Sequence, residues 1–234
     1  DEVYRTFGLS YKAELSTRPD DSMGSDEMWE LATSGLQKAL ENRGLDYIVN
    51  EGDGAFYGPK IDFHLRDSIG RTWQCGTIQL DMSLPEKFDL TYVGEDGEKH
   101  RPVMLHRVVY GSIERFIGIL IENFAGAFPV WMTPVQVRIL PITERHAEYA
   151  EELRKRMFDR GIRVEVDNRN EKTGYKIRES QVKKTPYTLV VGDQEQESGT
   201  VALRKYGEKD STVMSADDFI AFVEKKIAEH SPEY

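Results

Sequence analysis

The sequence predicts a mixed α/β (α+β) chain in two parts, an antiparallel sheet followed by a small α/β unit. The first observation is that apolar and polar residues alternate over 60–67 and 77–83, as in strands with one apolar face. The second is a change from strand to helix periodicity within 105–126. The third is the alternation of strand and helix patterns that begins near residue 135.

The first part is expected to open with a strand over residues 1–15, followed by a polar loop. Ser25 then predicts the cap of a helix that extends to about Arg43 and ends at a glycine. Residues 45–93 have the pattern of antiparallel strands, and 94–99 that of a hairpin tip. The residues expected to form the buried stripe of the helix are Met28, Leu31, Ala32, Ala39 and Leu40.

A strand and a helix follow each other directly at the end of the first part. Residues 102–110 are rich in Val, Met and Leu, as in a buried strand, and Ser112 is a fair N-cap for the amphipathic helix that Gly126 ends. This unit holds His106 on its strand and Arg115 in the first helical turn, where the helix dipole favours acids instead. Arg115 therefore either binds a nucleotide or pairs with Glu114 or Glu122 of its own helix.

The second part alternates strands with helices, which predicts a small α/β sheet with helices on its faces. Its last helix starts with an S-x-x-D pattern at Ser215 and Asp218. The expected strands are 135–141, 162–167, 187–192 and 200–206. The expected helices are 144–160, 174–183 and 215–230.

Composition narrows the class of protein. The chain has 234 residues and 39% hydrophobic content, enough for two modest domains with separate cores. No apolar run reaches the roughly 18 residues of a membrane span, so no membrane partner is expected. The first 15 residues lack the features of a signal peptide, and the single cysteine excludes an internal disulfide. A reducing, cytoplasmic setting is therefore expected.

Charge is distributed unevenly. The formal net charge of −10 argues against nonspecific nucleic-acid binding. Residues 163–186 nevertheless carry seven Lys and Arg side chains against four Asp and Glu. An acidic protein with one basic stretch can still bind a specific nucleic acid. A solvated helix face is the other interpretation.

Two segments contain polar residues suited to a ligand site. In residues 54–63, GAFYGPKIDF, Pro59 and two glycines predict either a rigid turn that presents Tyr57 and Lys60 or a hairpin with an exposed lysine. In residues 71–81, two glutamines indicate a pocket that binds a ligand, unless this sheet faces solvent.

The orientation of side chains in residues 71–81 depends on Gly76. In a regular strand, one face would carry Cys75, Thr77, Gln79 and Asp81. A bulge at the glycine would turn Gln74 to the other face or back to the same one.

His106 does not form a zinc site by itself, because zinc takes about three or four protein ligands. Neither His64 nor His100 stands at a spacing that suggests a shared metal. His106 is therefore either a hydrogen-bonded core residue or a ligand whose partners precede residue 1.

Four segments closely resemble the bacterial threonyl-tRNA synthetase family, and they occur in its order. Residues 108–116, VVYGSIERF, look like motif 3 of the class II aminoacyl-tRNA synthetases. The prolyl, histidyl and glycyl enzymes share the fold but lack the YGPKIDF and QCGTIQLD pair in this form. The four segments are residues 54–67, 74–81, 103–122 and 170–179.

The resemblance implies the fold and activity of a threonine–tRNA ligase fragment. Residues 1–131 would be the C-terminal portion of an antiparallel class II catalytic domain, and 132–234 an anticodon-binding α/β domain with a mixed sheet. The partners implied are ATP with Mg²⁺, L-threonine, threonine tRNA and a second subunit of the full-length homodimer. Motifs 1 and 2 are not in the chain, so we expect the isolated chain to be inactive.

The resemblance also implies residue roles. Lys60 and Arg115 would be catalytic, with Gln74 and Arg115 at ATP. His106 would be one of three Zn²⁺ ligands, the other two preceding residue 1. The threonine pocket would contain Tyr57, Thr77 and Gln79. The anticodon would be bound by Asn170, Lys172, Arg178, Glu195 and Arg204.

An alternative function is a non-catalytic tRNA-binding module or a synthetase-like regulator. The presence of the implied catalytic and pocket residues together favours the enzyme, because a binding module has no need of them.

Overall fold

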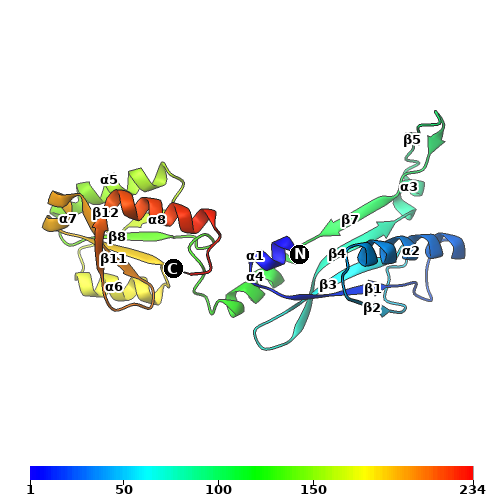
Figure 1. The fold of residues 1–234 in the computed structure, drawn as a ribbon, viewed down its shortest axis with the longest axis horizontal. Coiled ribbons are helices and arrows are strands. Elements are labelled where there is room, and N and C mark those ends of the chain that lie inside the picture. The colour runs from blue at the N-terminus through cyan, green and yellow to red at the C-terminus, as the bar shows by residue number, and fades with distance from the viewer. Residues whose placement is uncertain (234) are drawn as a thin grey trace. The chain divides into compact units, whose positions relative to one another are not determined.

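The computed structural model describes residues 1–233 (Figure 1). The chain divides into two compact units, Asp1–Asn123 and Phe124–Tyr234, and each is described by itself. The predicted fold class, an antiparallel-rich sheet followed by an α/β unit with a mixed sheet, is confirmed. Within residues 1–233, none of the helices combines the length and apolar character that crossing a membrane requires.

The first unit is built on a five-stranded sheet of order β2-β1-β3-β4-β7. The prediction of antiparallel strands is confirmed for β3 and β4. It is wrong for β2, which pairs parallel to β1 because helix α2 carries the chain back between them. The strands are β1 (Tyr11–Ser16), β2 (Tyr47–Asn50), β3 (Lys60–Arg66), β4 (Thr72–Asp81) and β7 (Met104–Val108).

The N-terminus is not the long strand that the sequence predicted. Helix α1 (Glu2–Thr6) precedes β1 and ends at Gly8, which has a φ of +69°. The amide of Gly8 donates to Arg5, and that of Leu9 donates to Tyr4, which is a Schellman closure of the helix. Tyr4 is buried, and its hydroxyl donates to the Val109 carbonyl at 2.8 Å. Tyr4, which the predicted strand included, therefore anchors a helical turn instead.

Helix α2 (Asp26–Asn42) begins where predicted, because the Ser25 side chain accepts a hydrogen bond from the Met28 amide. Its buried stripe is rotated from the predicted one, and Leu31 is 71% exposed. Trp29 drives the difference, since its ring is buried and its indole N–H donates to the Met23 carbonyl at 2.7 Å. The buried residues are Trp29, Ala32, Leu36 and Leu40.

The strand and helix predicted within residues 102–126 are present, but the strand is not buried as predicted. Strand β7 is an edge strand in this chain, so Leu105 is 62% exposed. Helix α4 (Ile113–Asn123) buries Phe116 and Leu120 and exposes Ile117 on its other side. The segment between β4 and β7 forms the short helix α3 (Ser83–Lys87) and a hairpin of β5 (Tyr92–Val93) and β6 (Lys99–His100).

The second unit has a mixed sheet of order β12-β11-β10-β8-β9, as predicted. Strand β8 pairs in parallel with β9 and β10, and the β10–β11 and β11–β12 pairs are antiparallel. The strands are β8 (Val137–Pro141), β9 (Val164–Val166), β10 (Tyr187–Val191), β11 (Thr200–Lys205) and β12 (Thr212–Ser215). The helices are η1 (Glu144–His146), α5 (Ala147–Phe158), α6 (Thr173–Val182), α7 (Asp193–Ser198) and α8 (Ala216–Ala228).

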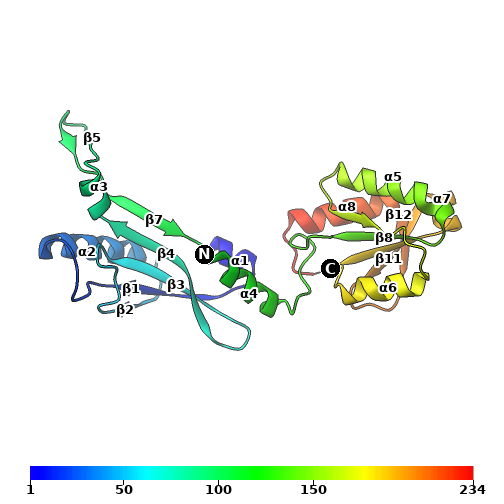
Figure 2. The same ribbon diagram turned by 180° about the vertical axis from the view of Figure 1, so that it is seen from behind.

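Helices cover both faces of this sheet. Helices α5 and α8 lie on one face and α6 on the other, as two opposite views show (Figures 1 and 2). Leu153 of α5 and Phe219 of α8 are fully buried against Tyr187 and Leu189 of β10. The prediction missed α7 and β12, because α7 is a polar six-residue helix without apolar periodicity and β12 is short and partly exposed.

Candidate functional site

A buried carboxylate, Asp62 on β3, organises the polar face of the first unit's sheet. Only 2% exposed, it accepts hydrogen bonds from Lys60 Nζ at 2.5 Å, Gln74 Nε2 at 2.6 Å and Thr77 Oγ1 at 2.7 Å. Ser16 Oγ of β1 donates at 3.2 Å to Asp62 Oδ2, the same oxygen that accepts the bond from Lys60. Sequence reasoning grouped Asp62 with the ordinary polar residues of this strand. The sequence held one indication of its role: Asp62 is two residues after Lys60, and the next strand carries the polar residues Gln74 and Thr77.

Lys60 is held in place and is not the exposed lysine of a simple hairpin. Its side chain is 14% exposed, and Nζ also donates to Asp53 Oδ2 at 3.0 Å. Partial burial lowers the pKa of Lys60, but the bonds and charges of Asp62 and Asp53 outweigh it, and the pKa is raised. The bond from Lys60 lowers the pKa of Asp53 in turn. Lys60 is therefore a fixed cation at neutral pH.

The turn before Lys60 packs tightly on β4. A Cβ on Gly58 would approach the Leu80 carbonyl oxygen to 2.0 Å, so only glycine fits. The Leu80 amide donates to the Pro59 carbonyl at 3.1 Å, which continues the ladder into the turn. Of the two interpretations of residues 54–63, the structure supports a rigid turn and not a hairpin with an exposed lysine.

Strand β4 is irregular, and this decides which side chains face Asp62. The β3–β4 register shifts between Phe63 and His64, so that Gln74 and Gly76 oppose adjacent residues and Cys75 bulges out. Gln74 therefore joins Thr77 at Asp62. The expectation that Cys75 shares this face is wrong, because it assumed a regular strand. Cys75 is 1% exposed, and this burial raises the pKa of its thiol.

A second cluster lies at the far end of β4. Tyr57 Oη donates to Gln79 Oε1 at 2.8 Å, and the rings of Tyr57 and His106 are 6.5 Å apart. Gln79 and His106 are register partners on β4 and β7. Tyr57 and His106 line one hollow of about 200 Å³ with Asp81. The structure thus brings two of the three predicted threonine-pocket residues next to the predicted zinc ligand.

His106 is bound by Asp81, a partner that the sequence did not reveal. The distance from His106 Nε2 to Asp81 Oδ2 is 2.9 Å, and Asp81 is only 2% exposed. Burial raises the pKa of Asp81, but the bonds from His106 and from the amides of Leu84 and Ser83 outweigh it and lower the pKa. No three His, Cys, Asp or Glu side chains gather for a metal anywhere in residues 1–233.

Arg115 reaches from α4 to the neighbouring strand. Its Nη1 donates to the Gln74 carbonyl at 2.7 Å, and its guanidinium lies 6.0 Å from the centre of the Trp73 ring. Glu122, one of the glutamates considered as its partner, is bound instead by Arg71 at 2.9 Å. Within residues 1–233, Arg115 forms no ion pair with Glu122 or with Glu114, the other glutamate considered, so the alternative of a pair within the helix does not describe this arginine.

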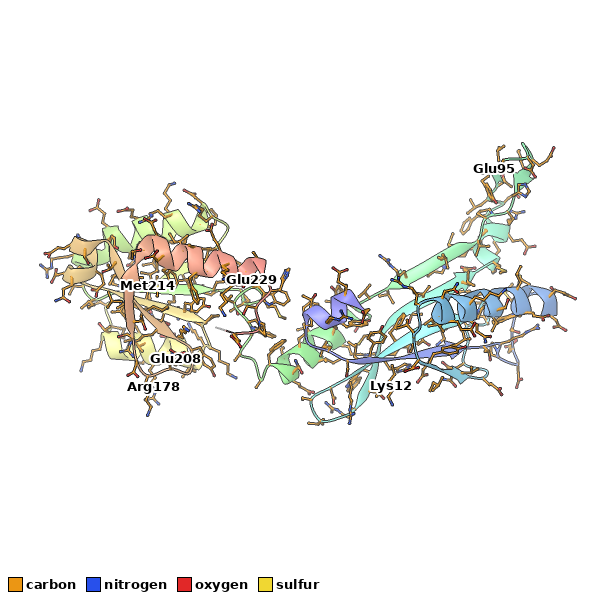
Figure 3. The ribbon with its side chains drawn as sticks, in the orientation of Figure 1. Lys12, Glu95, Arg178, Glu208, Met214 and Glu229 are labelled. Atoms are coloured by element: carbon orange, nitrogen blue, oxygen red, sulfur yellow. The ribbon has the colours of Figure 1, made fainter. Side chains whose placement is uncertain are left out.

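The predicted anticodon residues are spread over the loop after β9 and three elements of the second unit. Asn170 and Lys172 lie around the start of α6, and Glu195 lies in the first turn of α7. Arg178 projects from α6 (Figure 3), and Arg204 of β11 donates to the Lys209 carbonyl at 2.8 Å. Within residues 1–233, no hydrogen bond or ion pair joins any two of these five side chains.

The comparisons with known proteins agree with this architecture. Residues 1–124 match the tRNA synthetase class II core domain (G, H, P, S and T), and residues 136–226 match the anticodon binding domain. The chain therefore belongs to the class II aminoacyl-tRNA synthetase family. Within that family it corresponds to the C-terminal part of the threonyl-tRNA synthetases, as the sequence motifs predicted.

Individual relatives and solved structures support the correspondence to threonyl-tRNA synthetases. The chain is 66% identical over 98% of its length to the threonine–tRNA ligase of Carboxydothermus hydrogenoformans, and 67% over 97% to that of Desulforamulus reducens. It spans about 36% of each relative. The RNA binding domain of Cryptosporidium parvum threonyl-tRNA synthetase aligns with a TM-score of 0.90 at 37% identity, over 96% of this chain and 57% of that one. A putative threonyl-tRNA synthetase from Aeropyrum pernix aligns at 0.73 and 27%, over 98% and 58%.

Replacing Asp62 tests its organising role. We expect Asp62→Asn to lower the free energy of unfolding by about 2–3 kcal/mol, because the buried end of Lys60 loses its counter-charge. Urea unfolding at pH 7 measures the change. Asp53→Asn is the matched control, since Asp53 binds the same lysine with 54% of its side chain exposed. Equal effects from the two variants would contradict the assignment.

The Asp81–His106 pair predicts a pH-dependent contribution to stability. The folded-state pKa of Asp81 is below its unfolded value of about 3.9, so the contribution is complete above that pH and disappears as pH falls through the folded-state pKa. Asp81→Asn should therefore lower the urea midpoint at pH 7, and the difference should narrow below about pH 4. The exposed Asp46→Asn is the control. A difference that is constant with pH would show that Asp81 does not act through its charge.

Proposed function

We propose that the chain is the C-terminal part of a threonine–tRNA ligase, which uses ATP to activate L-threonine and transfers it to threonine tRNA. Residues 1–131 are assigned to the catalytic domain and 132–234 to the anticodon-binding domain. The observation that carries the proposal is the convergence of Lys60, Gln74 and Thr77 on the buried Asp62. The identity of about two thirds to curated threonine–tRNA ligases supports it.

The ATP site is assigned to Arg115, Gln74 and Lys60. The Gln74 carbonyl holds the Arg115 guanidinium, whose planar cation suits stacking on an adenine and donation to the γ-phosphate. Lys60 remains charged between two carboxylates, which suits it to stabilise negative charge that develops on the α-phosphate. Because both cations are already oriented, little reorganisation is needed when charge develops. Mg²⁺ would accompany the ATP phosphates.

The threonine pocket is assigned to Tyr57, Thr77 and Gln79. Tyr57 and Gln79 already bond to each other, so each holds the other's polar group in a fixed direction. Thr77 is held by Asp62 on the same strand face as Gln79. A pocket that hydrogen-bonds the threonine hydroxyl rejects valine far better than an apolar pocket of the same shape.

Zinc is assigned to this site with His106 as one ligand. Asp81 binds Nε2, which leaves Nδ1 as the ring nitrogen for the metal and matches the carboxylate–histidine arrangement of many zinc ligands. No group of three potential ligands is present in residues 1–233, so the site needs ligands from elsewhere in the protein. When bound, zinc would supply a Lewis acid for the threonine amino and hydroxyl groups.

The second unit is assigned to the anticodon of threonine tRNA, with Asn170, Lys172, Arg178, Glu195 and Arg204 as contacts. Its match to the anticodon binding domain supports this assignment. A homodimer of the full-length enzyme and a cytoplasmic location complete the proposal. A non-catalytic tRNA-binding module remains the second candidate, because the anticodon match by itself requires no catalysis.

The enzyme assignment predicts that the isolated chain does not catalyse threonine-dependent ATP–pyrophosphate exchange. The motif 2 arginine and two zinc ligands of the family are not in this chain, so half of the ATP site and most of the metal site are missing. The full-length relative from Carboxydothermus hydrogenoformans, assayed in parallel, is the positive control. Exchange by the isolated chain above the no-threonine background would overturn this prediction.

The RNA assignment predicts that Arg178→Ala and Arg204→Ala each weaken binding of threonine tRNA by about fivefold or more. Both side chains would donate to anticodon base edges, and truncation removes the donors. Filter binding at fixed salt measures the affinity. Lys155→Ala on the exposed side of α5 is the control, since its ammonium pairs only with Asp159 in residues 1–233. Unchanged affinity in both arginine variants would count against the anticodon assignment.

A further inference from the structure

Two arginines from different elements contact the ring of Trp73 on β4. The guanidinium of Arg71, in the turn between β3 and β4, is 5.3 Å from the centre of the ring, and that of Arg115 on α4 is 6.0 Å from it. Both distances are within the range of a cation–π contact, for which tryptophan is the best aromatic partner. Trp73 therefore contacts the arginine that is assigned to ATP, although it has no role of its own in that site so far.

The Trp73 ring is anchored by a buried carboxylate, Asp67, in the same turn. Trp73 Nε1 donates to Asp67 Oδ2 at 2.9 Å, and the Asp67 side chain is 0% exposed. The carboxylate also accepts hydrogen bonds from Arg71 Nε at 2.6 Å and from the amides of Arg71 and Ile69. Burial raises the pKa of Asp67, but the bonds from Trp73 and Arg71 outweigh it and lower the pKa to about 2. Asp67 is therefore a charged acceptor at neutral pH that fixes the direction of the indole N–H.

Helix α4 is tied to the start of β4 at both of its ends. At its C-terminal end, Glu122 accepts two hydrogen bonds from Arg71 Nη2, at 2.9 and 3.2 Å. At its N-terminal end, Arg115 Nη1 donates to the Gln74 carbonyl at 2.7 Å. The anchored ring and the helix that carries Arg115 are therefore held together by contacts on either side of it.

A single hydrogen bond does not fix the plane of a guanidinium. Within residues 1–233, the bond to the Gln74 carbonyl is the one hydrogen bond of the Arg115 side chain, and this side chain has no ion pair. The group can turn about that bond unless one of its faces rests on a second surface. Trp73 is the aromatic residue that contacts it. The orientation of the guanidinium therefore depends on this ring.

We propose that Trp73 is a positioning residue for ATP, because its ring, anchored by Asp67, holds the Arg115 guanidinium in the orientation that stacks on the adenine. This inference rests on the proposed ATP site and adds a residue that does not itself touch the nucleotide. Without the ring, Arg115 has to be ordered when ATP binds, which weakens the binding of ATP. The threonine pocket is unaffected, since its β4 residues Thr77 and Gln79 lie further along the strand.

The first test measures threonine-dependent ATP–pyrophosphate exchange by the full-length enzyme that contains this chain. Trp73→Leu should raise the KM for ATP about fivefold and leave the KM for threonine within about twofold, because only the nucleotide contact loses its support. Trp73→Phe keeps an aromatic face and should recover most of the affinity for ATP. Trp73→Met fills more of the volume without an aromatic face and repeats the test if the leucine variant does not fold.

Trp29→Leu is the matched control. Trp29 of α2 also has an arginine beside its ring, Arg18 at 5.7 Å, and its indole N–H also donates a hydrogen bond. The KM for ATP should not change in this variant. Thermal melting shows whether each variant is folded.

A second measurement needs neither ATP nor catalysis. NMR relaxation of labelled arginine side chains in the whole 234-residue chain reports their order on the ps–ns timescale. The Arg115 guanidinium should be ordered in the parent chain and become mobile in Trp73→Leu. Arg18, whose partner Trp29 is unchanged, should have the same order in both chains.

Three outcomes would contradict the inference and leave the proposed function intact. One is an active Trp73→Leu enzyme with the KM for ATP of the parent. Another is an equal rise in the KM for ATP and for threonine that Trp73→Phe does not reverse, which would indicate a structural role alone. The third is a folded Trp73→Leu chain in which Arg115 stays as ordered as in the parent. Absence of threonine-dependent exchange by the full-length parent enzyme would instead defeat the proposed function itself.

Discussion

The buried pair between Lys60 and Asp62 is the interaction on which the first unit's polar face depends. A carboxylate that is 2% exposed is tolerated because four donors from β1, β3 and β4 satisfy its two oxygens. Satisfying Asp62 fixes Lys60, Gln74 and Thr77 in position at the same time. The polar groups are thus preorganised, because their orientations are fixed before a ligand binds.

The same constraint applies to several other residues for which a functional role is proposed. His106 is oriented by the buried Asp81, and Arg115 is held by the Gln74 carbonyl beside the Trp73 ring. The Trp73 indole is held in turn by the buried Asp67 in the turn before β4. In each case a charged or polar group of one element is fixed by an acceptor of another. Fixed dipoles and charges of this kind require little reorganisation when a ligand develops charge.

The partners of these groups explain the limits of prediction from sequence. Asp62 and Asp81 have the same local pattern as exposed strand residues, and only strand pairing reveals that both are buried. The bulge at Cys75 removes this residue from the face of Thr77 and places Gln74 there, a choice that the sequence left open because periodicity assumes an unbroken ladder. The predicted burial of β7 failed for a related reason, since hydrophobicity does not say whether a strand lies at an edge.

The sequence by itself determined the strands β3 and β4, the capped helices α2 and α8, the mixed sheet of the second unit and the synthetase family. These follow from local periodicity, from caps such as Ser25 and Ser215, and from contiguous motifs. The tertiary structure alone decided the parallel pairing of β2, the burial of Asp62 and Asp81, and the contacts of Trp73 with Asp67 and Arg115. Those features arise from contacts between residues far apart in the chain, where burial and long-range pairing set the energy of a polar group.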